Sequence, residues 1–162
     1  MRSTDLYTFL DTNGDGTGTK NAIGDYSGGQ NFYFTCPETA TSVDIYRMIV
    51  YVEDSGNFSS AGYGNLSALT NGIQIRQEKE GETIDMTNSQ EVKTNAEWSK
   101  FCYDVTYISF GSGNNALSIR WTFRNSGSPV KLDPGEKFIV YLEDNLTGLV
   151  QHTFQIQGQY NW

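Results

Sequence analysis

Residues 11–16 of this chain read D-T-N-G-D-G, a spacing of oxygen-bearing side chains that could hold a metal ion. In a calcium loop, oxygens at alternate positions, here from Asp11, Asn13 and Asp15, converge on one hard cation. The second half of such a loop does not follow, because Ala22 stands where a bidentate glutamate should be. The alternative is a turn in which Asp and Asn side chains bond their own backbone. The sequence favours the turn, so we expect no cofactor, with Ca²⁺ as the alternative.

A single histidine limits the catalytic chemistry that the chain can offer. His152 is the only one, which excludes a multi-histidine metal centre and makes any Ser-His-Asp or Cys-His arrangement depend on this ring. It lies on the apolar side of an alternating segment, beside Phe154, and the sequence holds no G-x-S-x-G motif. We therefore expect His152 in or beside the core, no catalytic residues, and a protein that is not an enzyme.

Two pairs of neighbouring acids end predicted strands. Glu53 with Asp54, and Glu143 with Asp144, could supply the two carboxylates of a glycosidase. The sequence fixes no separation between the carboxylates, on which that chemistry depends. Ordinary charges at a sheet edge are the favoured interpretation.

Aromatic residues are abundant and could form a platform on which sugar rings stack. Aromatic side chains also fill β-sheet cores and subunit interfaces, which is the favoured interpretation. The platform candidates are Tyr7, Tyr26, Tyr63, Trp98, Tyr160 and Trp162.

These residues are carried by segments of period two. Odd-numbered positions from Phe101 to Tyr107 are apolar, and after a Gly/Asn-rich loop the alternation resumes from Leu117 to Phe123. Successive side chains of a strand point to opposite faces, so this region predicts a long hairpin with one buried face. Such alternation is typical of antiparallel rather than parallel sheets.

Eight segments have strand composition and are separated by Gly/Asn turns. They are Leu6–Leu10, Asn31–Cys36, Val43–Glu53, Gly72–Lys79, Lys100–Phe110, Ala116–Asn125, Lys137–Asp144 and Val150–Gly158, with a further short strand over Thr83–Met86. The best helical segment, Asn65–Thr70, has one or two turns at most. We predict an all-β antiparallel sandwich or jelly roll, as a single domain over residues 1–162. An N-terminal arm or turn-rich segment is expected over about residues 1–30.

The side-chain pattern assigns a role to two of these strands. Val43–Glu53 is apolar on both faces, with Val43, Ile45 and Ile49 on one, and is predicted to be central. Even residues from Val150 to Ile156 are predicted to face the core, which leaves a row of glutamines on the other face.

Composition narrows the classes of partner. Eleven basic against nineteen acidic residues give a net charge of −8, and no basic cluster is present, so nucleic acid is not an expected partner. Residues 1–15 contain no long apolar run, so we expect neither a secretory signal nor membrane association. Cys36 and Cys102 are expected to be free thiols.

Three segments resemble, as a set, the jelly-roll capsid decoration (cement) proteins of marine and cyanobacterial tailed bacteriophages. They are D-T-N-G-D-G-T-G-T-K at 11–20 followed by G-D-Y-S at 24–27, Y-G-N at 63–65 with L-T-N-G-I at 69–73, and K-T-N-A-E-W at 93–98. The segment L-E-D-N-L-T-G-L at 142–149 is similar to the end of such virion proteins.

The resemblance implies an accessory protein that is assembled in the host cytoplasm and lies on the outer surface of the virion capsid. It implies binding to the major capsid protein, commonly as a homotrimer, and clamping of neighbouring capsomers. The contact surfaces we predict are residues 1–15, 54–64 and 77–95, which are polar segments outside the predicted core strands. The alternatives are a phage fibre or baseplate accessory protein and a carbohydrate-binding β-sandwich module.

Overall fold

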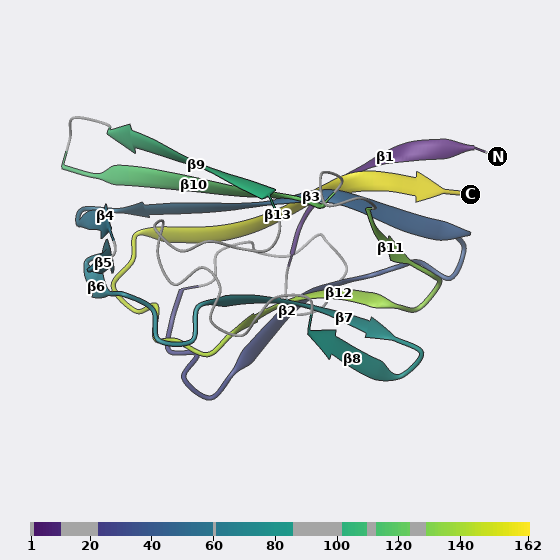
Figure 1. Cartoon of the computed structure of the whole chain (residues 1–162), viewed down its shortest axis with the longest axis horizontal. Coiled ribbons are helices and arrows are strands. Elements are labelled where there is room, and N and C mark those ends of the chain that lie inside the picture. Colours follow the sequence, from purple (N-terminus) through teal and green to yellow (C-terminus); the bar gives the residue numbers. More distant parts are fainter. Residues whose placement is uncertain (1, 11–22, 60, 86–101, 110–112, 124–128) are drawn as a thin grey trace.

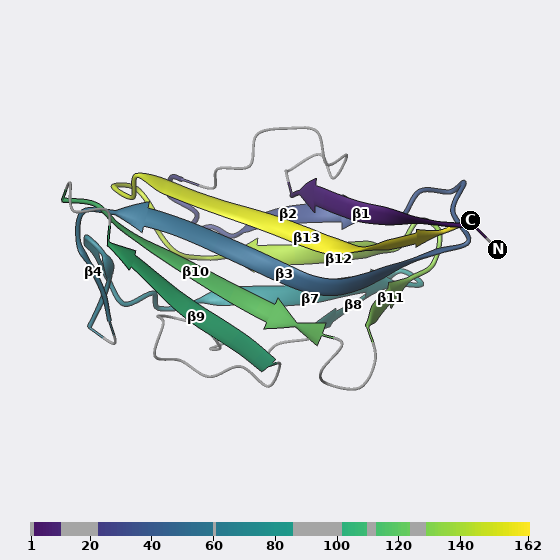
Figure 2. The same cartoon turned by 90° about the horizontal axis from the view of Figure 1, so that it is seen from above.

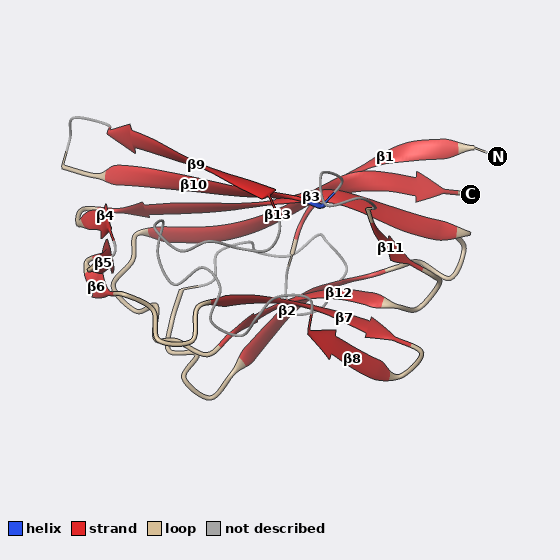
Figure 3. Ribbon diagram, in the orientation of Figure 1, coloured by secondary structure: helices blue, strands red, loops and turns tan. Residues whose placement is uncertain are grey.

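Two antiparallel sheets face each other and enclose the core (Figure 1). The structure, a computed structural model, describes residues 2–10, 23–59, 61–85, 102–109, 113–123 and 129–162. No α-helix occurs among these residues, and Figure 3 shows mainly strands and loops, with a single short 3-10 piece after β10. The predicted all-β antiparallel sandwich is therefore confirmed.

The larger sheet has six strands in the order β1-β13-β3-β10-β9, with β11 also paired to β3 (Figure 2). Because β3 has a strand on each side along most of its length, its predicted central position is confirmed. The strands of this large sheet are β1 (Ser3–Phe9), β3 (Ser42–Asp54), β9 (Cys102–Ser109), β10 (Asn115–Thr122), β11 (Val130–Leu132) and β13 (Gln151–Asn161).

The smaller sheet has the order β2-β12-β7-β8, and three very short strands form a third sheet at one end of the molecule. The small sheet consists of β2 (Gln30–Thr35), β7 (Ile73–Lys79), β8 (Glu82–Asp85) and β12 (Lys137–Leu142). The third sheet consists of β4 (Asn57–Ser59), β5 (Gly62–Gly64) and β6 (Leu66–Ser67).

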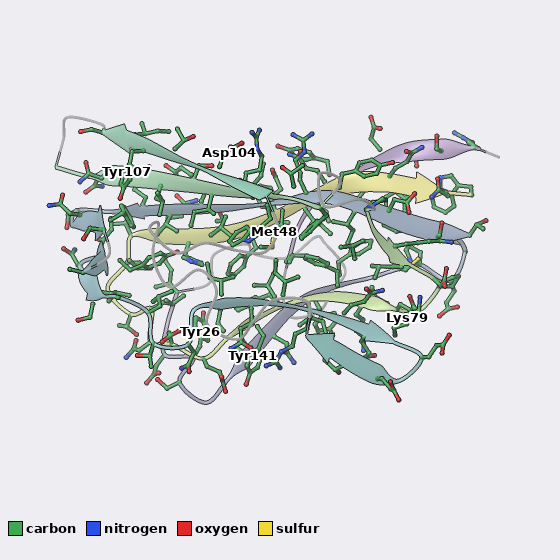
Figure 4. The ribbon with its side chains drawn as sticks, viewed as in Figure 1. Tyr26, Met48, Lys79, Asp104, Tyr107 and Tyr141 are labelled. Atoms are coloured by element: carbon green, nitrogen blue, oxygen red, sulfur yellow. The ribbon has the colours of Figure 1, made fainter. Side chains whose placement is uncertain are left out.

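Aromatic contacts between the two main sheets hold the sandwich together. Phe123, just after β10, lies 5.7 Å from Phe138 of β12, and Phe32 of β2 lies 5.6 Å from Phe154 of β13, measured between ring centroids. One continuous hydrophobic cluster includes residues of both sheets. In Figure 4, Met48 points into this interior, whereas Asp104 lies on the opposite side of the large sheet.

The predicted hairpin is present as β9 and β10, in the expected register. Trp121 pairs with Tyr103 and Leu117 with Tyr107, so odd-numbered positions of the two strands stand opposite each other. Ile119 and Trp121 are fully buried, as predicted. Tyr107 is 48% exposed because β9 is the edge strand, and its ring packs on Phe58 at 6.3 Å.

The two apolar faces predicted for residues 43–53 are wrong, and the cause is a β-bulge. Gln157 pairs with Arg47 but Gly158 pairs with Ile45, so Tyr46 is one extra residue on β3. A bulge of this kind reverses the side-chain alternation. Val43 and Ile45 before it, and Met48, Val50 and Val52 after it, consequently all face the core. Gly158 is required here, since a Cβ atom would lie 1.9 Å from the Asp44 carbonyl oxygen.

Three further expectations need correction. Residues 65–70 form no helical turn: they contain the short strand β6, and the chain turns at Gly72, which has a φ of 76°. Within the predicted arm over residues 1–30, residues 3–9 form β1 of the large sheet and Leu6 is buried. Val150 precedes β13 and is half exposed instead of buried.

Candidate functional site

His152 lies in the core, as the sequence predicted. A hydrogen bond of 3.1 Å joins its Nε2 atom to the Tyr63 hydroxyl, and its ring lies 4.8 Å from that of Phe154. Both His152 and Tyr63 are fully buried, and the His152 Nδ1 atom has no hydrogen-bond partner among the described residues. Burial lowers the pKa of His152 to about 3 and raises the pKa of Tyr63. The ring is therefore neutral and out of contact with solvent at neutral pH.

Asp54 is a buried anchor and not the edge charge that the sequence suggested. It is fully buried at the end of β3, and the backbone N–H of Asn65 donates to its Oδ2 atom. The Asn65 side-chain amide donates to Asp54 Oδ1 at 3.0 Å. The carboxylate thus ties residues 54–65, which form β4 and β5, into a closed loop.

Asp144 anchors a second loop in the same way. The backbone N–H groups of Thr70, Asn71 and Gly72 donate to its two carboxylate oxygens at 2.8–3.2 Å. Only 7% of Asp144 is exposed, so the edge-charge interpretation is wrong for this residue too. Buried anions are stabilised by several backbone N–H donors of this kind. Both carboxylates are therefore engaged in holding loops.

These anchored loops meet at one end of the sandwich, which we call the loop end (residues 23–29, 54–72 and 143–149). An isolated bridge pairs Asp25 with Asn145, and the Leu146 N–H donates to the Gly24 carbonyl oxygen at 2.7 Å. A groove of about 520 Å³ opens there. Its lining combines the apolar side chains of Leu66, Ala68 and Leu69 with polar groups, which come from Ser27, Ser67, Thr70, Asn71, Glu143, Asp144, Asn145 and Thr147.

The predicted aromatic platform is divided between separate parts of the molecule. Tyr63 is buried, and the Tyr26 hydroxyl donates to the Ile23 carbonyl oxygen at 2.9 Å. Trp162 is 40% exposed and stacks on Tyr160 at 5.4 Å, at the end of the molecule where both chain termini lie. Tyr7 is on the large sheet, and Trp98 lies outside the described residues.

The strand pairing of the large sheet aligns residues in rows across its outward side, which we call the outer face. The strand pairing aligns Tyr7 with Gln157 and Gln157 with Arg47. The next row aligns Phe9, Gln155, Ile49, Arg120 and Asp104. The outward positions of β13 supply a column of glutamines, which are Gln151, Gln155, Gln157 and Gln159.

A hollow of about 320 Å³ lies on the outer face over the β-bulge. Tyr7, which is 67% exposed, lines it together with Arg47 and Gln157. Asp5 and Tyr46 complete its polar lining, and the Tyr46 hydroxyl donates to Gln159 Oε1 at 2.7 Å. Sequence reasoning could not identify this site, because the bulge that places Arg47 on the outward side is not visible as a residue pattern.

The calcium candidates Asp11, Asn13 and Asp15 lie outside the described residues. Among the residues that are described, no three His, Cys, Asp or Glu side chains are grouped so as to hold a metal ion. Cys36 is a buried free thiol, as expected. The described part of the chain also contains no helix with the length and apolar character needed to cross a bilayer.

No family model, curated protein or solved structure matches this chain.

Proposed function

We propose that this protein is a structural virion protein that binds the outer surface of an assembled phage capsid and clamps neighbouring capsomers. Its partner would be the major capsid protein, and the working form a homotrimer. The resemblance of the segments at 11–27, 63–73, 93–98 and 142–149 first suggested this function. Two of these segments, 63–73 and 142–149, lie within or next to the loop end.

The observation that carries the proposal is that the loop end is held in shape from within. Asp54 fixes Asn65, and Asp144 fixes residues 70–72, through hydrogen bonds to buried carboxylates. A surface that is already ordered loses little conformational entropy when it binds. The groove beside the residues that Asp144 holds therefore suits a docking surface for a rigid protein lattice.

The loop end includes one of the contact surfaces that the sequence predicted, residues 54–64, and leaves out the other two. Within residues 54–64, Phe58 and Tyr63 belong to the core, so only the polar positions around them are available. Within residues 1–15, β1 pairs with β13 and is part of the large sheet. Residues 77–79 end β7 and residues 82–85 form β8, and neither segment lines the groove, while residues 86–95 lie outside the described residues.

Assembly-dependent binding follows from the geometry of a trimer on a shell. Three copies of the loop end reach several capsomers at once, so weak single contacts add up to high avidity. Free capsid subunits offer one contact at a time and bind weakly. The protein is therefore expected to recognise assembled shells in preference to free subunits.

The test is binding of the purified protein to undecorated mature shells, with shell stability measured by thermal disruption. We expect saturable binding in many copies per shell and a higher disruption temperature. Thr147→Arg places a long cation at the groove and should weaken binding at least about tenfold. Thr39→Arg is the matched control, because Thr39 is exposed near the opposite end and precedes Thr41, which bonds Asn161.

Equal binding by both variants would contradict a docking role for the loop end. Failure of the unmodified protein to bind shells would overturn the proposed function itself.

A further inference from the structure

We propose that the hollow on the outer face is a binding site for a neutral polysaccharide chain. The site is formed by Tyr7, Arg47 and Gln157, with Asp5 and Tyr46 at its margin. It lies on the outer face and not at the loop end, so this inference is independent of the proposed capsid function.

The backbone creates the space for a ligand. Tyr46 is the extra residue of the bulge, and Gly158, which pairs with Ile45, lies against the β3 backbone at the base of the hollow. A bulge bends and twists the strand locally, which opens the surface above it. The resulting hollow of about 320 Å³ is open to solvent on the side where Tyr7 stands 67% exposed.

The polar groups of the hollow retain hydrogen-bonding capacity. Among the described residues, the Arg47 guanidinium has no ion-pair or hydrogen-bond partner, although the residue is half buried. The side-chain amide of Gln157 donates to Gln155 Oε1 at 3.1 Å, which leaves the Gln157 carbonyl oxygen able to accept. The Arg47 guanidinium and the Gln157 carbonyl oxygen are therefore available to a ligand, unlike the carboxylates of the loop end.

A sugar chain fits this set of side chains. Sugar hydroxyls both donate and accept hydrogen bonds, as side-chain amides do. A guanidinium group adds donors and a carboxylate group adds acceptors. The exposed phenol ring of Tyr7 offers an apolar surface on which the face of a sugar ring packs. Adjacent strands lie about 4.8 Å apart, so the row Tyr7–Gln157–Arg47 presents three contacts across the sheet at regular spacing.

Other ligand classes fit less well. A nucleic acid would need several cations to neutralise phosphates, whereas the hollow has one arginine beside the acid Asp5. A protein partner would be expected to meet an apolar centre with a polar rim. Here the centre of the face is a column of glutamines, with Gln155 and Gln157 side by side.

The glutamine column indicates the direction in which a chain would lie. Gln151, Gln155, Gln157 and Gln159 project outward from the same strand, and Tyr51 and Ile49 of β3 flank them on one side. A polysaccharide that enters the hollow at Tyr7 can continue along β13 over these amides. The site therefore suits a chain of several sugar units more than a single sugar.

The experiment is a titration of the protein with a panel of neutral hexasaccharides, containing glucose, xylose, mannose or N-acetylglucosamine units, followed by NMR and calorimetry. Heparin, a sulfated chain, is titrated in parallel as the acidic polysaccharide. We expect one or more neutral hexasaccharides to bind and to shift the backbone amide signals of Tyr7, Arg47 and Gln157. Tyr7→Ala should weaken that binding at least about tenfold.

Tyr33→Ala is the matched control, because Tyr33 lies on the outward side of the small sheet. It should leave hexasaccharide affinity unchanged. Absence of binding across the neutral panel, binding of heparin alone, or signal shifts confined to the loop end would each overturn the proposal. Tyr7→Ala should bind capsid shells normally and Thr147→Arg should bind hexasaccharides normally, so failure of one proposal is distinguishable from failure of the other.

Discussion

The loop end and the outer face use polar residues in opposite ways. At the loop end, Asp54 and Asp144 are buried and their oxygens accept backbone hydrogen bonds. On the outer face, Arg47 and the glutamine column are accessible and only partly bonded. A polar group that is satisfied internally serves the fold, whereas a group with spare capacity beside a hollow is available to a ligand. This comparison predicts that substitution of a buried group lowers stability strongly, whereas substitution of an accessible polar group on the outer face lowers it little.

The largest effect is expected for the core beneath the outer face. Trp121→Ala should lower the free energy of unfolding by about 3–5 kcal/mol, because a fully buried ring is replaced by a cavity. Arg120→Ala, on the next residue but pointing outward, should cost less than about 1 kcal/mol, since its ion pair with Asp104 is exposed. Urea denaturation of both variants measures the difference. Equal losses would mean that the register of β10 is wrong.

An intermediate effect is expected at the loop end. Asp144→Ala removes the acceptor of three backbone N–H groups and should cost about 2–3 kcal/mol. Asn145→Ala is the control, because its side chain makes one exposed bond to the Thr147 N–H and should cost less than about 1 kcal/mol. Thermal denaturation compares the two. If both variants were equally stable, the loop end would not be held by its carboxylate.

Judged per pH unit, the smallest effect is a dependence of stability on pH. The pKa of His152 is lowered to about 3 in the folded protein, against 6.5 for an exposed ring. The unfolded chain therefore binds a proton that the folded chain does not, and stability falls as the pH drops from about 6.5 toward 3. The slope from this group is at most about 1.4 kcal/mol per pH unit.

His152→Gln keeps a hydrogen-bonding group near Tyr63 and should reduce the slope between pH 6.5 and 5. Urea denaturation at several pH values measures it. An unchanged slope in this variant would show that other groups account for the acid sensitivity.

Period-two patterns predicted most of the fold because they reflect burial directly. All eight predicted strands are present, and the hairpin formed by β9 and β10 has the predicted register. The short strands β4, β5, β6 and β11 were missed, since two or three residues are too few to show an alternation. The bulge at Tyr46 was missed because one extra residue reverses the alternation within the strand. In the sequence, such a strand has the same pattern as one with two apolar faces.

The candidate sites were harder to predict than the fold. The burial of His152 followed from its place beside Phe154 in an alternating segment. The roles of Asp54 and Asp144 depend on loops that approach from elsewhere in the chain, and no local pattern records such an approach. The same is true of Tyr7, Gln157 and Arg47, which come together only through pairing of β1, β13 and β3.

The position of β13 in the large sheet determines when the strands of that sheet can pair during synthesis. β1 pairs with β13, and β13 pairs in turn with β3, so residues 151–161 lie between two strands from early in the chain. Among the described residues β1 pairs only with β13, so on the ribosome it stays unpaired until residues 151–161 have emerged, and the large sheet forms in full only after that. Contacts between such distant segments form slowly. Until β13 is made, the nascent chain therefore exposes an unpaired edge of β3. Release of an incomplete chain, or crowding of several nascent chains, would favour aggregation through this edge.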